Sequence, residues 1–130
     1  MPTLFNDETE GAGVGERGPV RALQAWQYLI ARAANRQIVR YKELRDLMDY
    51  PNDNPLAGIL GCVAYYCMQH DLPPLTVIVV NRHGEPGGGF PIPAGATIGQ
   101  LREDVFEYPW FKLMPPTIDE FAEARRLARE

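Results

Sequence analysis

The segment that most restricts the fold is the apolar run at residues 75–80, which reads LTVIVV. All of its residues after Leu75 are β-branched, a composition typical of a buried strand. Pro73 and Pro74 precede the run, and the turn-forming sequence NRHGEPGGG follows it at residues 81–89. We therefore expect a strand at residues 75–80, a turn or wing after it, and a short returning strand at residues 90–92.

Helical periodicity predicts the other elements. One helix is expected from Pro19 to about residue 34, a short one at residues 41–48 after an extended piece at 37–40, and a third at residues 54–70 with Asn54 as its cap. Two more are expected at residues 97–107 and 117–129, the last opened by a capping box from Thr117 to Glu120. The expected core stripes are Val20, Leu23, Trp26, Ile30 and Ala34 in the first helix, and Leu56, Ile59, Leu60, Val63, Ala64 and Cys67 in the third.

Composition limits the protein class and its compartment. The 130 residues fit one domain, and a net charge of −4 argues against a protein that coats nucleic acid electrostatically. Residues 1–17 are acidic and glycine-rich, so we expect a mobile tail followed by one domain at residues 18–130. We expect no signal peptide, membrane anchor or disulfide, and hence a cytoplasmic protein.

The expected order of helix, helix, strand, glycine-rich wing and strand is a winged-helix layout, an α+β core extended by C-terminal helices. The sequence IVRYKEL at residues 38–44 resembles the V-T-Y-G-E-L stretch of the alkylguanine-DNA alkyltransferases. LGCVA at residues 60–64 resembles that family's V-G-N-A-L in its recognition helix, and residues 75–80 with the Gly84 turn resemble its P-C-H-R-V-V and following turn. The resemblance covers about residues 37–90.

The resemblance implies binding without alkyl transfer. The family's tyrosine that presses on a DNA phosphate corresponds to Tyr41, but its base-replacing arginine falls near Gly58 and its reactive cysteine near Thr76. Cys62 and Cys67, on an apolar helix, are expected to have raised pKa values and poor access. A relative of the alkyltransferase-like proteins, which lack the cysteine, is therefore implied.

A local basic segment is the first candidate site. Between residues 32 and 45 five cations face one acid, Glu43. This asymmetry suggests phosphate contacts, which the wing would extend. The alternative is a solvated face on which these cations pair with Asp46, Asp49 or Glu43, and residues 54–70 contain no lysine or arginine to read bases. The predicted nucleic-acid contacts are Arg40, Tyr41, Lys42, Arg45, Asn81, Arg82 and His83.

Two other functions stay open. A protein partner would bind two surfaces of the domain. One is the wing, and the other is the face of the third helix made by Gly58, Cys62, Tyr65 and Gln69. A small hydrolase would use His83 and Glu85 of the wing as acid and base, whereas a plain hairpin turn would need neither. The GVGERG motif at residues 13–18 lacks the strands of a dinucleotide site, and Cys67, His70 and His83 are too few for structural zinc. No cofactor or metal is therefore predicted.

Overall fold

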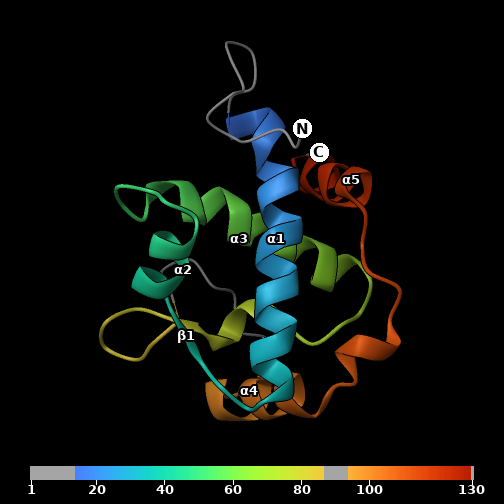
Figure 1. The fold of residues 1–130 in the computed structure, drawn as a ribbon. Coiled ribbons are helices and arrows are strands. Elements are labelled where there is room, and N and C mark those ends of the chain that lie inside the picture. Colours follow the sequence, from blue (N-terminus) through green and yellow to red (C-terminus); the bar gives the residue numbers. More distant parts are fainter. Residues whose placement is uncertain (1–13, 87–93, 130) are drawn as a thin grey trace.

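The computed structural model describes residues 14–86 and 94–129, which are mostly helical (Figure 1). In these ranges a two-stranded parallel sheet joins the helices, so the broad α+β class is correct. The predicted returning strand at residues 90–92 lies outside the described residues. In chain order the elements are α1 (Val14–Ala34), β1 (Val39–Arg40), α2 (Tyr41–Leu47), α3 (Asn54–Gln69), the 3-10 helix η2 (Leu75–Ile78), β2 (Val79–Val80), α4 (Ile98–Glu107), the 3-10 helix η3 (Trp110–Lys112) and α5 (Ile118–Ala128).

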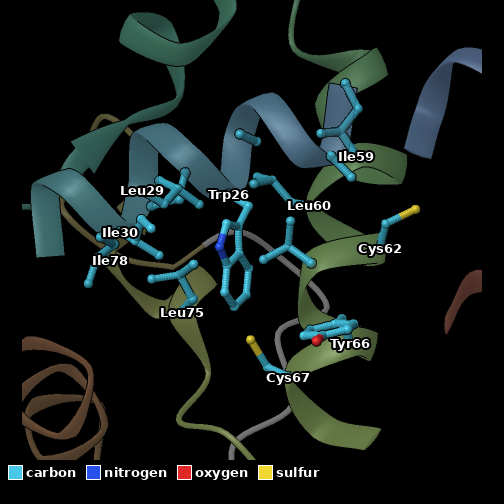
Figure 2. Packing of buried hydrophobic residues seen from close by; sticks show 14 of the residues in the cluster. Trp26, Leu29, Ile30, Ile59, Leu60, Cys62, Tyr66, Cys67, Leu75 and Ile78 are labelled. Carbon is cyan, nitrogen blue, oxygen red and sulfur yellow. The ribbon is translucent and has the colours of Figure 1, made fainter. Parts of the chain in front are cut away.

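Helix α1 is the central element, and Trp26 lies at the middle of the core as predicted. The Trp26 ring makes edge-to-face contacts with Tyr66 of α3, Trp110 of η3 and Phe121 of α5. The ring centroids are 5.6, 5.4 and 6.0 Å apart, respectively. Figure 2 shows the indole between Leu75 of η2 and Tyr66. Such edge-to-face pairs add to the burial of large apolar area, so one aromatic cluster holds four elements together.

The buried faces of α1 and α3 differ from the predicted stripes. On α1 the fully buried positions are Ala22, Ala25, Leu29 and Ala33 beside Trp26, whereas Ala34 is exposed. The alanines let α3 and α5 approach α1 closely, which a pattern weighted by large apolar residues does not reveal. On α3, Cys62 and Tyr66 are buried as well, because α5 covers a second face of this helix.

The apolar run at residues 75–80 is not the predicted strand. After Pro74 the chain turns into η2, closed by the Val77 N–H donating to the Pro74 carbonyl at 2.9 Å, and only Val79 and Val80 are extended. All six residues are buried. The β-branched composition therefore reflects burial, and the strand is short because its partner β1 has only two residues before α2 begins.

Local signals set the starts of the last two helices. The hydroxyls of Thr97 and Thr117 accept hydrogen bonds from the N–H groups of Gln100 and Glu120, both at 3.1 Å, and the predicted capping box at Thr117 is confirmed. Helix α3 departs from its prediction by one residue. Its cap is Asp53, and the Asn54 N–H donates to the side-chain oxygen of Asn52 at 2.9 Å.

The first helix begins earlier than predicted. It starts at Val14, so the last residues of the expected tail are helical, and residues 1–13 lie outside the described ranges. Gly18 is buried inside this helix, where a Cβ would come within 2.7 Å of the Arg125 guanidinium of α5. The lack of a side chain at Gly18 therefore leaves room for Arg125 beside this part of α1.

The ends of α1, α2 and α3 share one geometry. Each helix is followed by a non-glycine residue in the left-handed region: Arg36 (φ 58°), Asp49 (φ 60°) and Asp71 (φ 56°). In each case this residue donates its N–H to the carbonyl three residues earlier, and the next residue donates to the carbonyl five residues earlier. These bonds form a Schellman motif, in which glycine is usual at the left-handed position.

Helix α4 ends because of Pro109. The Val105 carbonyl would accept from the N–H four residues later, but that residue is Pro109, which has none. The indole Nε1–H of Trp110 donates to this carbonyl instead, at 2.7 Å and away from solvent. Trp110 is buried in the core, whereas Phe111 is exposed.

Candidate functional site

The parallel sheet brings the two halves of the predicted nucleic-acid site together. Val39 pairs with Val79 and Arg40 with Val80, so both strands end at the same edge of the sheet. There β1 continues into α2, and β2 continues into the turn at residues 81–86; α2 and this turn lie on the same side of α1 (Figure 1). We define the strand-end edge as Arg40, Tyr41, Lys42, Arg82 and His83.

The turn after β2 is held by Asn81. Its side-chain Oδ1 accepts the N–H groups of His83 at 2.8 Å and Glu85 at 3.2 Å, and its own N–H donates to the Glu85 carbonyl at 2.8 Å. Gly84 has a φ of +78°, and Val80 and Pro86 form an antiparallel bridge across the turn. The amide of Asn81 is thus engaged inside the turn, while Arg82 and His83 are exposed at its tip.

Most cations of the basic segment pair with carboxylates. Arg32 lies 2.9 Å from Glu43, Arg36 lies 2.6 Å from Glu103, and Lys42 lies 3.4 Å from Asp46. Arg45 lies 3.5 Å from Asp46 and 3.4 Å from Asp53. Arg32, Lys42 and Arg45 therefore pair with carboxylates that the ion-paired alternative named, whereas Arg36 pairs with Glu103, which it did not name. In the described ranges no ion pair involves Arg40, which lies on the strand-end edge.

Lys42 and Arg45 differ in how far their charged groups remain accessible to solvent once they are ion-paired. The Lys42 side chain is 76% exposed and its contact with Asp46 is long, so the ammonium is accessible to solvent. The Arg45 side chain is only 25% exposed and bridges α2 to the loop before α3. Arg45 is consequently placed to hold α2, and the strand-end edge does not include it.

Glu43 organises the start of α2, a role beyond the ion pairing that the sequence suggested for it. Its carboxylate accepts the Tyr28 hydroxyl and the Arg40 backbone N–H, the latter at 3.4 Å, and pairs with Arg32. Burial, followed by the hydrogen bond to Glu43, raises the pKa of Tyr28. A glutamate three residues into a helix is a usual cap signal, but its partners on α1 lie far away in sequence.

The second candidate face does not form as predicted. Cys62 is buried against α5, and Gln69 donates its side-chain Nε2 to the Ala124 carbonyl of α5 at 2.9 Å. Gly58 and Tyr65 stay at the surface, with Tyr65 39% exposed. The prediction of one open face through Cys62 is wrong because α5 covers that part of α3.

The described residues offer little for nucleophilic or metal chemistry. Burial raises the pKa of Cys62, and it raises the pKa of Cys67 to about 12, so both thiols are protonated at neutral pH. Within the described ranges no three His, Cys, Asp or Glu side chains gather as metal ligands. His83 and Glu85 are both exposed on the turn, where water competes with any acid–base pair. Thr76 is buried, and its hydroxyl has no hydrogen-bond partner among the described residues.

No protein-family model, curated protein or solved structure matches the chain. In the part of the chain that the structure describes, none of the helices combines the length and apolarity needed to cross a bilayer. The function is therefore inferred from the strand-end edge itself.

Proposed function

We propose that this domain contacts nucleic-acid phosphates through the strand-end edge without catalysing a reaction. The observation that carries the proposal is the parallel register of Arg40 with Val80, which puts the start of α2 beside the turn that bears Arg82 and His83. The resemblance of residues 37–90 to the winged-helix half of the alkylguanine-DNA alkyltransferases supports the same surface, because Tyr41 corresponds to a phosphate-pressing tyrosine. A winged-helix core is part of the proposal.

The chemistry of the edge fits backbone contact rather than base reading. Guanidinium and ammonium groups form charge-assisted hydrogen bonds with phosphate oxygens, and Arg40, Lys42 and Arg82 present such groups to solvent. Helix α3 carries no lysine or arginine with which to reach base edges. We expect weak binding with little sequence preference and, for about three phosphate contacts, a log–log salt slope near −2.7 on duplex DNA.

Fluorescence anisotropy with labelled duplex and single-stranded oligonucleotides tests the proposal at about 50 and 200 mM salt. Lys42→Ala and the triple change of Arg40, Lys42 and Arg82 to alanine should weaken binding stepwise and flatten the salt slope. Lys112→Ala is the charge-matched control, since Lys112 is exposed and belongs to η3, a segment that lies across α1 from α2 in Figure 1. No binding of the wild type at the lower salt would reject the proposal, as would an equal loss in Lys112→Ala.

A protein partner is the second candidate, favoured by the exposed part of α3. This helix is uncharged and exposes Tyr65 and Met68, the latter 59% exposed. Aromatic and methionine side chains are enriched in protein interfaces. Such binding should tolerate salt and fail in Tyr65→Ala, whereas phosphate binding should survive that change.

A further inference from the structure

Arg102 of α4 donates hydrogen bonds to the segments on both sides of β2, including the turn that carries Arg82 and His83. Its Nε donates to the Val77 carbonyl at 3.3 Å, and its Nη2 donates to the Gly84 carbonyl at 3.0 Å. Val77 belongs to η2, before β2, and Gly84 belongs to the turn after β2. One guanidinium therefore spans the strand and joins both of its flanks to α4.

This link complements the bonds inside the turn. The Asn81 side chain closes the turn on itself, but those bonds do not fix the turn against the rest of the domain. Helix α4 lies against η2 and α1, so a bond from Arg102 ties the turn to the core. Arg102 is partly buried, in contrast to the exposed Arg82 and His83 that follow β2.

We propose that Arg102 is the positioning residue of the strand-end edge: it holds Arg82 and His83 next to Arg40 and Lys42 and does not itself touch the phosphate. The inference rests on the proposed function for its role in binding. Arginine suits this task because its rigid fork presents several donors at fixed angles. A lysine keeps the charge but ends in one ammonium, which cannot reproduce the two-point geometry.

The first test needs no nucleic acid. Amide hydrogen exchange followed by NMR compares the wild type with Arg102→Lys and Arg102→Met, with attention to the amides of His83 and Glu85, which donate to Asn81. Both variants should speed exchange of these amides by about tenfold or more, as expected for the loss of two charge-assisted bonds. The amide of Leu29, in the buried face of α1, serves as the control and should change less than about twofold. Unchanged turn amides, or protection fully restored by lysine, would overturn the proposal.

The second test measures binding. Arg102→Lys and Arg102→Met should weaken oligonucleotide binding to a similar degree, and the loss should vanish when Arg82 and His83 are both alanine. An equal loss in that background, or full binding by Arg102→Lys, would mean that Arg102 acts by charge or direct contact and would reject its positioning role. If the wild type binds no nucleic acid, the proposed function fails and the role of Arg102 in binding fails with it, whereas the exchange rates still decide whether Arg102 fixes the turn.

Discussion

Arg36 and Glu103 form an ion pair, with one guanidinium nitrogen against both carboxylate oxygens, that joins the end of α1 to α4. Nη2 of Arg36 lies 2.7 Å from Oε1 and 2.6 Å from Oε2 of Glu103, and the guanidinium also lies over the Phe106 ring, 5.3 Å from its centroid. Arg36 adopts the left-handed conformation that ends α1, so the pair and the end of the helix depend on the same residue. The hydrogen bond from Arg36 lowers the pKa of Glu103 below its ordinary value of 4.5.

Glu103→Gln should reduce stability in a pH-dependent way. A carboxylate with a lowered pKa in the folded state stabilises the fold above its unfolded pKa, and this contribution disappears as the pH falls through the folded value. The variant should therefore unfold at lower urea than the wild type near pH 7, and the difference should shrink as the pH falls below the ordinary carboxyl pKa of 4.5. Because the pair is exposed, about 1 M salt should narrow the difference at neutral pH. A difference that is independent of pH would contradict this account.

Trp110→Phe should destabilise the fold by about 1–3 kcal/mol, because the Val105 carbonyl would lose its donor without gaining another. The change keeps an aromatic ring against Trp26, which limits the loss of packing. Urea unfolding monitored by circular dichroism measures the difference. Phe111→Leu is the control, since Phe111 is exposed and this change should be nearly neutral. Equal stability of wild type and Trp110→Phe would show that the indole bond is not needed to end α4.

Asp71→Gly should stabilise the protein by about 0.5–1 kcal/mol. Asp71 holds a positive φ at the end of α3, where a Cβ is unfavourable and a negative charge opposes the helix dipole. Asp71→Ala removes the same charge but keeps the Cβ, so the difference between the two variants isolates the backbone effect. If alanine stabilises as much as glycine, the left-handed conformation is not the cause.

The thiols should make stability fall in alkali. Burial raises the pKa of Cys67 from 9.0 to about 12, so this thiol stays protonated in the folded state while it ionises in the unfolded chain. Stability from this group is complete below about pH 9 and is lost as the pH rises toward 12. The urea midpoint should drop between about pH 8 and about pH 10.5, and should drop less in Cys67→Ala than in the wild type.

A disulfide reagent should label Cys62 and Cys67 only after unfolding, and rapid labelling of native protein would contradict the buried environment of both.

The bounds of α2 to α5 agree with the prediction to within one residue at both ends, and α1 ends where predicted, but α1 begins at Val14, before the predicted Pro19. Thr97 and Thr117 mark the starts of α4 and α5 in the sequence, because their hydroxyls cap the first turns of these helices. Arg36, Asp49 and Asp71 end helices where glycine would be the sequence signal, so the left-handed conformation depends on the surrounding structure. The β-branched run at residues 75–80 identified a buried segment correctly and its conformation incorrectly, since the short β1 decides how much of it can pair.

The candidate site was predictable in its cations and not in their partners. Arg40, Lys42, Arg82 and His83 are visible in the sequence, but their proximity depends on a pairing between residues 39 and 79. Glu103 neutralises Arg36 from far along the chain. Arg102 left no sequence signal, because its acceptors are backbone carbonyls, which every residue carries.

The pairing of Val39 with Val79 also determines when the proposed binding surface forms during folding. The chain between them, including α2 and α3, must close as a long loop before the first sheet bond forms. Only contacts that form afterwards offset the entropy lost in closing this loop. Val39 and Val79 belong to the same buried cluster as the core residues of α1, α3 and α5. We therefore expect the strand pair to form together with this core, so that a nascent or unfolded chain holds its basic residues apart.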